Sequence, residues 1–203
     1  CIAADGHGKN HDRDGTICNF VEALDMVVAD GRQVRCSRTD NSDLFWATVG
    51  GMGLTGFIYA AQLRLSPIGS DSIEMLSIRT SSLAETCRVF AETQDQYRYS
   101  VAWIDCLARG ARLGRSLVML GEHAPAAQKA RRNPLRAHRD GRLDVPVFFP
   151  PWALCRPTVR AFNWAYYHRQ RRREVRSRVH YDPFFYPLDT VAHWNRIYGR
   201  RGF

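Results

Sequence analysis

The chain has 203 residues, a formal net charge of +9 at pH 7, and hydrophobic and charged fractions of 45% and 24%. These fractions are ordinary for a globular protein, and a chain of this length can bury a substantial core. No apolar run approaches the ~20 residues of a membrane-spanning helix, and no signal-peptide pattern stands at the start. The sequence does not fix the compartment: cytoplasmic and membrane-associated locations both stay open, with no spanning segment in this sequence.

The first seventy residues predict three strands and one short helix. Apolar runs predict strands at 21–28, 34–36 and 57–65, and Asp30-Gly31 between the first two is a signal for a type I′ hairpin. The helix is predicted at 43–49, with Asn41 or Ser42 as its N-cap and a glycine pair at its end.

The residues that follow predict a second group of elements in the order strand, helix, strand, strand. The strands are expected at 73–79, 99–106 and 116–121, and the helix starts at Ser81 or Ser82 with apolar residues at helical spacing. This order predicts an α+β fold with a mostly antiparallel sheet. Residues 125–144 are polar and basic and predict a mobile loop, and 159–173 predict a helix that starts after Pro157.

Arginine supplies most of the positive charge and is concentrated in two segments. Such clusters attract phosphate groups on nucleic acid, anionic lipid or a small substrate, and a solvated surface is an equally good interpretation. The clusters are Arg131, Arg132, Arg136, Arg139 and Arg142, and Arg169, Arg171, Arg172, Arg173, Arg176 and Arg178.

The cysteines stand far apart, at positions 1, 18, 36, 87, 106 and 155. No CxxC pair is present, which argues against a zinc ribbon, and the spacing does not suit a compact disulfide scaffold. We expect buried free thiols, which would suit a reducing compartment.

A literal G-x-G-x-x-G motif runs from Gly51 to Gly56. Dinucleotide binding by this motif requires that it follow a strand and open a helix. Here it follows a predicted helix and opens a predicted strand, so the context argues against a Rossmann site. The glycines still allow the backbone to approach a flat ligand closely.

Ionisable and flexible residues are concentrated in the segment from Asp5 to His11. His7 and His11 are possible metal ligands, but no third ligand is nearby in the sequence, so a metal site is the weaker interpretation. A functional loop is the stronger one, because polar residues on glycine-rich loops often serve binding or catalytic sites.

Several segments in order along the chain resemble one known fold family. Residues 3–11 (AADGHGKNH) and 44–56 (LFWATVGGMGLTG) resemble the vanillyl-alcohol-oxidase-type FAD-binding fold. Within that fold, residues 100–105 (SVAWID), 187–189 (PLD), 194–196 (WNR) and 198–199 (YG) are similar to the substrate domain of the decaprenylphosphoryl-β-D-ribose oxidase group. Counted as four motifs, with the segments between 187 and 199 taken as one, this set in the same order is far more specific than any one of them.

The resemblance implies two domains. Residues 1–70 would be the C-terminal lobe of a VAO/PCMH-type FAD-binding domain, and residues 71–203 would be part of an α+β substrate (cap) domain with an antiparallel sheet. It also implies that the sequence is an internal fragment, which we expect to bind FAD poorly alone and to be colourless when purified.

The resemblance further implies which residues serve the site, and it includes no metal ligand. His7 would be catalytic, at the place where the substrate meets the flavin. The residues implied at the flavin are Ala4, Asp5, Gly6, His7 and Ile58. The residues implied at the substrate are Lys9, Trp103 and Arg196.

The implied activity is oxidation of a sugar hydroxyl to a ketone by hydride transfer to FAD. The substrate would be a lipid-phosphate-linked pentose, a sugar alcohol or an aldonolactone, with possible association with a membrane surface. The alternatives are a basic nucleic-acid-binding module and an inactive fragment without FAD. Net charge alone is weak support for nucleic-acid binding, so no nucleic-acid partner is expected.

Overall fold

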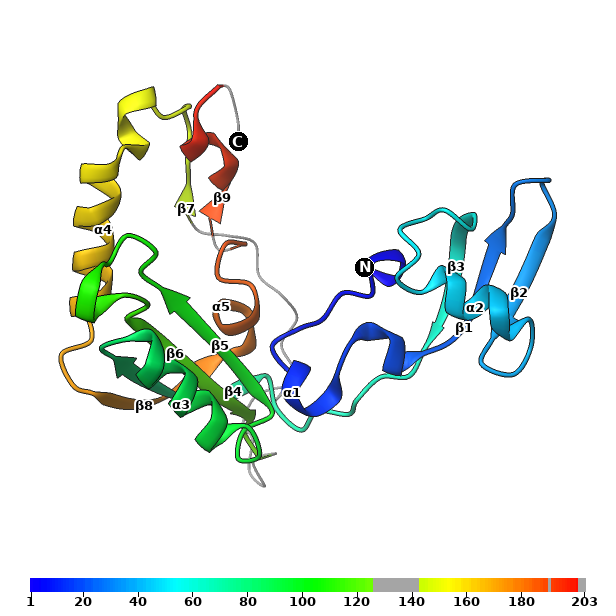
Figure 1. Cartoon of the computed structure of the whole chain (residues 1–203), viewed down its shortest axis with the longest axis horizontal. Coiled ribbons are helices and arrows are strands. Elements are labelled where there is room, and N and C mark those ends of the chain that lie inside the picture. The colour runs from blue at the N-terminus through cyan, green and yellow to red at the C-terminus, as the bar shows by residue number, and fades with distance from the viewer. Residues whose placement is uncertain (126–142, 190, 201–203) are drawn as a thin grey trace, which may run out of the picture. The chain divides into compact units, whose positions relative to one another are not determined.

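A computed structural model describes residues 1–125, 143–189 and 191–200. The chain forms two compact units, Cys1–Pro67 and Ile68–Phe203, which are described separately (Figure 1). Most of the predicted mobile loop at 125–144 lies outside the described residues, as do the arginines of the cluster at 131–142.

The first unit is a small antiparallel sheet with one helix on it. Strands β1 (Val21–Val27), β2 (Gln33–Ser37) and β3 (Phe57–Leu63) pair in the order β2-β1-β3. Helix α2 (Ser42–Thr48) buries Phe45 against β1, in a core that includes Leu24, Met26 and Cys36. Strand β1 is the central strand of this sheet, and its Val21, Leu24 and Met26 are buried in this core. The predicted strands and helix are confirmed here.

One local prediction in this unit is wrong, and the predicted N-cap position is confirmed without its side-chain hydrogen bond. The hairpin is not type I′, because only Gly31 has a positive φ, whereas that turn needs positive φ at both central residues. The Gly31 backbone N–H donates to the Val28 carbonyl, as in a type I turn followed by a glycine bulge. Asn41 stands at the N-cap of α2, but its side chain donates to the Arg35 carbonyl and does not cap the helix.

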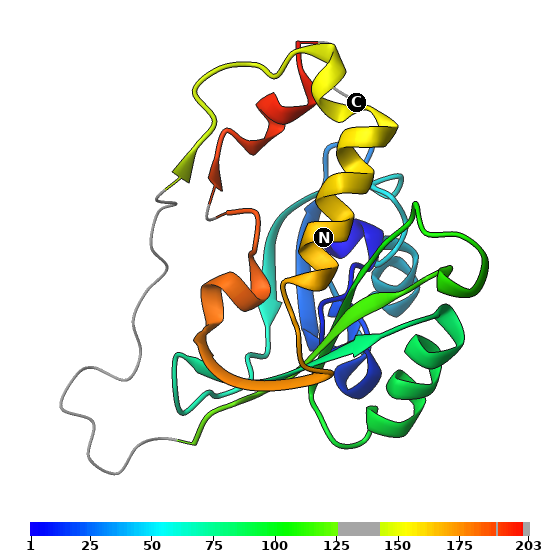
Figure 2. The same cartoon turned by 90° about the vertical axis from the view of Figure 1, so that its left-hand side faces the viewer.

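The second unit contains an antiparallel sheet covered on both faces. Strands β4 (Ser72–Thr80), β5 (Tyr99–Ile104), β6 (Ser116–His123) and β8 (Glu174–His180) pair in the order β5-β6-β4-β8. Helix α3 (Leu83–Thr93) packs on one face, while α4 (Arg156–His168) and α5 (Tyr181–Phe185) lie on the other (Figure 2). Short strands β7 (Leu143–Asp144) and β9 (Val191–Ala192) form a separate parallel pair.

Period-two alternation explains this arrangement. Leu76 and Ile78 on β4 face α3 and pack with its Val89, whereas Ile73 faces α5 and packs with Phe184. The helix α3 begins where the sequence predicts, since the Ser82 side chain accepts a hydrogen bond from the Glu85 backbone. The predicted α+β order with antiparallel strands is therefore confirmed.

The prediction of a helix extending to residue 173 is wrong at its C-terminal end. Helix α4 ends at His168, and residues 174–180 form β8 at the edge of the sheet. Gln170 fixes the connection between α4 and β8 against β4. Its side chain donates to the Ser77 carbonyl and accepts from the Ser77 hydroxyl, and its backbone carbonyl accepts from Arg79. These contacts join residues far apart in sequence, so no local pattern in the arginine-rich segment indicates them.

The expectation of buried thiols is also wrong for most of the cysteines. All six lie in the described residues and are unpaired, but only Cys36 is buried. Its thiol packs in the core of the first unit, where burial raises its pKa above the ordinary value. The other five are exposed or half-buried.

The motif glycine Gly51 has a packing role that the structure makes testable. A Cβ at this position would overlap the Ala47 carbonyl at the end of α2, whereas a Cβ at Gly53 would meet nothing nearby. We expect Gly51→Ala to destabilise the first unit by about 1–3 kcal/mol, because backbone atoms cannot rotate out of the way. Urea unfolding followed by Trp46 fluorescence measures this.

The matched control is Gly53→Ala. At Gly53, whose φ is +82°, alanine should lower the free energy of unfolding by only about 1 kcal/mol, because it must adopt the left-handed conformation but meets no neighbouring atom. Equal midpoints for the two variants would contradict a steric role for Gly51.

Candidate functional site

The segment at 2–7 is a tight loop built on backbone contacts. A 3₁₀ helix at Ile2–Ala4 ends at Asp5, which takes the left-handed conformation with φ of 44°. The Asp5 carboxylate accepts a hydrogen bond from the Cys18 backbone at 3.1 Å, and the Gly6 carbonyl accepts one from the Ile17 backbone at 2.9 Å. A left-handed conformation at a non-glycine residue persists only where neighbouring groups stabilise it. The hydrogen bond from Cys18 to the Asp5 carboxylate supplies such a contact and connects the loop to residues 17–18.

The two segments that carry the family resemblance lie side by side in this unit. The Gly50 N–H donates to the Ile2 carbonyl at 3.2 Å, and the Met52 N–H donates to the Ala3 carbonyl at 2.7 Å. Gly50 has a φ of +77°, a left-handed conformation that favours glycine where the helix end meets the loop. The glycine-rich segment therefore supports the loop at 2–7.

His7 lies at the exposed end of this loop. Its Nδ1 is 3.3 Å from the Gly8 carbonyl, and its ring packs edge-on against His11 with centroids 4.5 Å apart. A shallow cavity of about 300 Å³ lies beside it. The residues lining the cavity are Cys1, Gly6, His7, Gly8, Asn10, Gly15, Thr16, Ile17 and Phe20. The imidazole is therefore accessible to a small polar ligand.

Small side chains leave the backbone around His7 open. Ala4 is exposed, and a Cβ added at Gly6 would meet only the Cys1 carbonyl, at 3.7 Å. An open surface of this kind allows a flat ring to lie close to the backbone. The residues present are therefore compatible with a flavin at this loop.

Lys9 and Ile58 belong to the same unit. Lys9 follows the loop and is half-buried, and this burial lowers its pKa from the ordinary value. Ile58, on β3, packs against the buried core beside Ile2 and remains partly exposed. Of the six residues proposed from this unit, Ile58 packs against the core, and Ala4, Asp5, Gly6, His7 and Lys9 lie on or directly after the loop at 2–7.

Trp103 and Arg196 lie on different elements of the second unit. Trp103, on β5, packs on the Tyr166 ring of α4 with centroids 4.7 Å apart. Arg196 lies in the 3₁₀ helix at Trp194–Tyr198, and its Nη1 donates to the Val145 and Pro146 carbonyls, both at 3.0 Å. These contacts orient the guanidinium and leave its other donors available.

His7 and His11 pack edge to face, but the described residues contain no group of three or more His, Cys, Asp or Glu side chains placed to hold a metal ion. Within the same described part of the chain, no helix is both long enough and apolar enough to cross a bilayer.

The second unit holds a buried polar network that the sequence does not indicate. Asp105, 2% exposed, accepts hydrogen bonds from Arg115 and from Asn163 at 2.7 Å. Burial opposes ionisation of Asp105, but these hydrogen bonds outweigh it and hold its pKa below the ordinary value. The network supports the floor of a cavity lined by further arginines, which the two predicted arginine clusters do not include.

Comparison with known proteins agrees with the resemblance seen in the motifs. No family model matches the chain. It is 33% identical over its full length to the decaprenylphosphoryl-β-D-ribose oxidase of Mycolicibacterium smegmatis, of which it covers 45%. It is 26% identical over 73% of its length to the human Δ24-sterol reductase, covering 27% of that protein.

A shorter segment, 22% of the chain, is 42% identical to the FAD-linked oxidoreductase nodO of Hypoxylon pulicicidum and covers 10% of it. The chain thus spans less than half the length of each of these relatives. The resemblance to FAD-linked oxidoreductases, and to the decaprenylphosphoryl-ribose oxidase in particular, is confirmed.

Proposed function

We propose that this chain, a homologue of FAD-linked oxidoreductases, is part of an enzyme that oxidises a hydroxyl of a lipid-phosphate-linked pentose to a ketone. The observation that carries the proposal is the loop at 2–7, held by Asp5 and by the 50–52 backbone, which presents His7 beside an open glycine-rich surface. The similarity of the whole of this chain to part of an oxidase named for a decaprenylphosphoryl ribose supports the substrate class.

The first unit would be the C-terminal lobe of a VAO/PCMH-type FAD-binding domain. On its strand β3 the side chains of Phe57, Tyr59 and Leu63 are exposed, although residues of these types are usually at least partly buried. An exposed apolar strand of this kind favours packing against further protein, as a two-lobed domain would supply. The second unit would be the substrate domain.

FAD, when bound, would supply the acceptor for the hydride that leaves the carbinol carbon. Ala4, Asp5, Gly6, His7 and Ile58 would line its place. Asp5 would act through the backbone, because its carboxylate is already engaged by the Cys18 N–H. Gly6 and Ala4 have small or no side chains and would leave room for the flavin ring.

His7 would take the hydroxyl proton as the alcohol is oxidised. Its ring is exposed beside a cavity, and its Nε2 is not engaged by the Nδ1 contact with Gly8. A general base must come within hydrogen-bond reach of the proton it removes, and an exposed loop histidine can do so.

Lys9, Trp103 and Arg196 would bind the substrate. The lowered pKa of Lys9 suits a half-buried amine that hydrogen-bonds a sugar hydroxyl. Trp103 offers an aromatic face to a sugar ring, and Arg196 retains donors for an oxygen of the substrate. A lipid-linked substrate would also bring the protein to a membrane surface, where its +9 charge is attracted to anionic lipid.

The test is an absorption spectrum of the purified polypeptide, at its natural length, after incubation with FAD and gel filtration. We expect a retained flavin spectrum that bleaches without oxygen when a polyprenyl-phosphoryl pentose is added. Loss of all flavin would overturn the proposal. Retention of flavin without bleaching by any sugar substrate would overturn the substrate class and leave flavin binding intact.

A further inference from the structure

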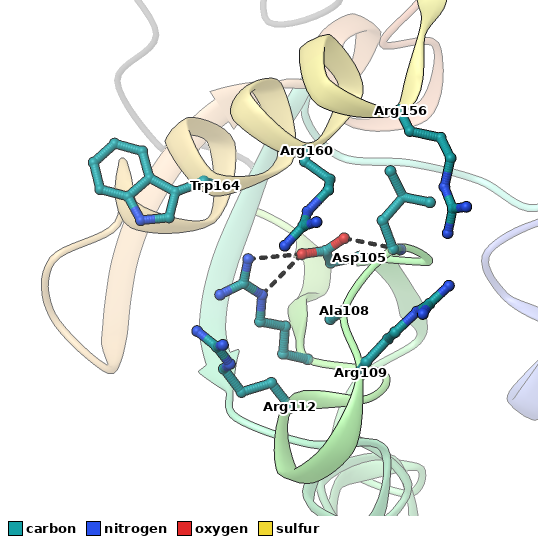
Figure 3. Close-up of a pocket in the computed structure, with 9 residues that line it drawn as sticks. Asp105, Ala108, Arg109, Arg112, Arg156, Arg160 and Trp164 are labelled. Carbon is teal, nitrogen blue, oxygen red and sulfur yellow. Dashed lines mark hydrogen bonds and ion pairs between the residues drawn. The ribbon is translucent and has the colours of Figure 1, made fainter.

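An arginine-lined cavity of about 560 Å³ lies in the second unit, between the loop after β5 and the start of α4 (Figure 3). Its volume is within the range of small-ligand sites. Its lining residues are Asp105, Leu107, Ala108, Arg109, Arg112, Arg115, Arg156, Arg160 and Trp164.

One arginine of the cavity is structural. Arg115, 8% exposed, donates to Asp105 from Nε at 2.9 Å and from Nη2 at 2.7 Å, and its guanidinium also lies over the Tyr167 ring. This ion pair cancels the one carboxylate of the cavity. It also fixes the loop that carries Arg109 and Arg112, because the Leu107 backbone donates to the same carboxylate.

No described residue neutralises the other four arginines of the cavity. Arg109 and Arg112 come from the loop, and Arg156 and Arg160 come from α4 on the facing side (Figure 3). Throughout 1–125, 143–189 and 191–200, no hydrogen-bond or ion-pair partner of these guanidinium groups is found. Four like charges around one cavity repel one another, and a bound anion relieves this repulsion.

The placement of Arg156 and Arg160 is locally unfavourable for the helix. They stand four residues apart on one face of α4, where like charges destabilise a helix. Arg156 also opens the helix, where the dipole favours negative charge, and the first turn has no acidic residue. Both costs vanish when an anion sits between them, which favours a binding role over a solvated surface.

We propose that this cavity binds a phosphate or diphosphate group. Arginine is suited to it, because its planar fork donates two parallel hydrogen bonds to phosphate oxygens. The rigid floor made by Asp105 and Arg115 limits the entropy lost on binding. The proposal does not depend on flavin chemistry, since it concerns residues of the second unit alone.

The test is calorimetric titration of the full chain with pyrophosphate at low ionic strength. The variant Arg156→Ala/Arg160→Ala should weaken binding by about tenfold or more, because it removes two charge-assisted donors. Arg88→Ala/Arg171→Ala removes the same charge from exposed positions that do not line the cavity, and it should change the affinity by less than about twofold.

Two further measurements identify the site and the source of the phosphate. Trp164→Phe should abolish a pyrophosphate-dependent fluorescence change without changing the affinity, since Trp164 lines the cavity. Flotation with phosphatidylcholine vesicles, with and without phosphatidic acid, distinguishes the sources. Phosphatidic-acid binding that pyrophosphate displaces assigns a lipid headgroup, and pyrophosphate binding alone assigns a soluble phosphate.

Equal weakening in the two double-arginine variants would overturn the proposal, because it would show attraction by net charge alone. Absence of binding to pyrophosphate and to phosphatidic acid would also overturn it. Neither result bears on flavin binding, which the absorption spectrum measures separately.

Discussion

Asp105→Ala should destabilise the second unit by about 3–5 kcal/mol, the usual cost of removing one partner of a buried ion pair. The substitution leaves the buried Arg115 guanidinium uncompensated and removes the acceptor of the Asn163 amide. Urea unfolding, followed by the fluorescence of the tryptophans in this unit, measures the loss as a fall in midpoint at constant slope.

Two controls separate this effect from the loss of any carboxylate. Glu74→Ala breaks an exposed pair with Arg178 at 4.0 Å and should cost at most about 1 kcal/mol. Asp105→Ala/Arg115→Met removes both buried charges and should recover much of the stability. A double variant less stable than Asp105→Ala would contradict the explanation by an unpaired charge.

The pH dependence follows from the lowered pKa of Asp105. Its folded-state pKa lies below the unfolded value, so its contribution is complete above about pH 4, the ordinary aspartate pKa. The contribution is lost as the pH falls through the folded-state pKa. The stability difference between the wild type and Asp105→Ala should therefore be constant from neutral pH down to about pH 4 and shrink below it. A difference that grows in acid would contradict this assignment.

Local patterns predict most of the elements of both sheets, because hydrophobic periodicity and capping residues lie within each element. Alternation on β4 decides which residues face α3 and which face α5, and Ser82 caps α3 as its residue type favours. Local patterns do not predict strand β8, because its pairing partner β4 lies about a hundred residues earlier and charged residues occupy three of its seven positions.

The sequence indicates part of the candidate site, and the roles of its residues stay predictions. The loop around His7 was recognised from its glycine and polar content, but its support by the 50–52 backbone required the structure. The arginine cavity was missed because Arg112 and Arg156 come from distant segments, and each segment read alone is a solvated surface. The available signal was the spacing of Arg156 and Arg160 at a helix start that lacks acidic residues.

His7→Ala should slow substrate-dependent flavin reduction by about 10²–10⁴-fold, the usual contribution of a positioned general base. The expectation rests on the proposed function and concerns the flavin-loaded polypeptide at its natural length. The loop should survive the change, because its hydrogen bonds are made by Asp5, Gly6 and the 50–52 backbone and not by the imidazole. Stopped-flow absorption without oxygen measures the reduction rate at saturating substrate.

The neighbouring His11→Ala is the matched control. Its ring is exposed and packs on His7 with centroids 4.5 Å apart, so its removal disturbs the same loop without removing the proposed base. It should slow reduction only a few-fold and, like His7→Ala, leave the flavin spectrum unchanged. Equal losses in both variants would assign the effect to loop geometry. An unaffected His7→Ala rate would place the proton acceptor elsewhere, and Lys9, whose pKa burial already lowers, would be the next residue to substitute.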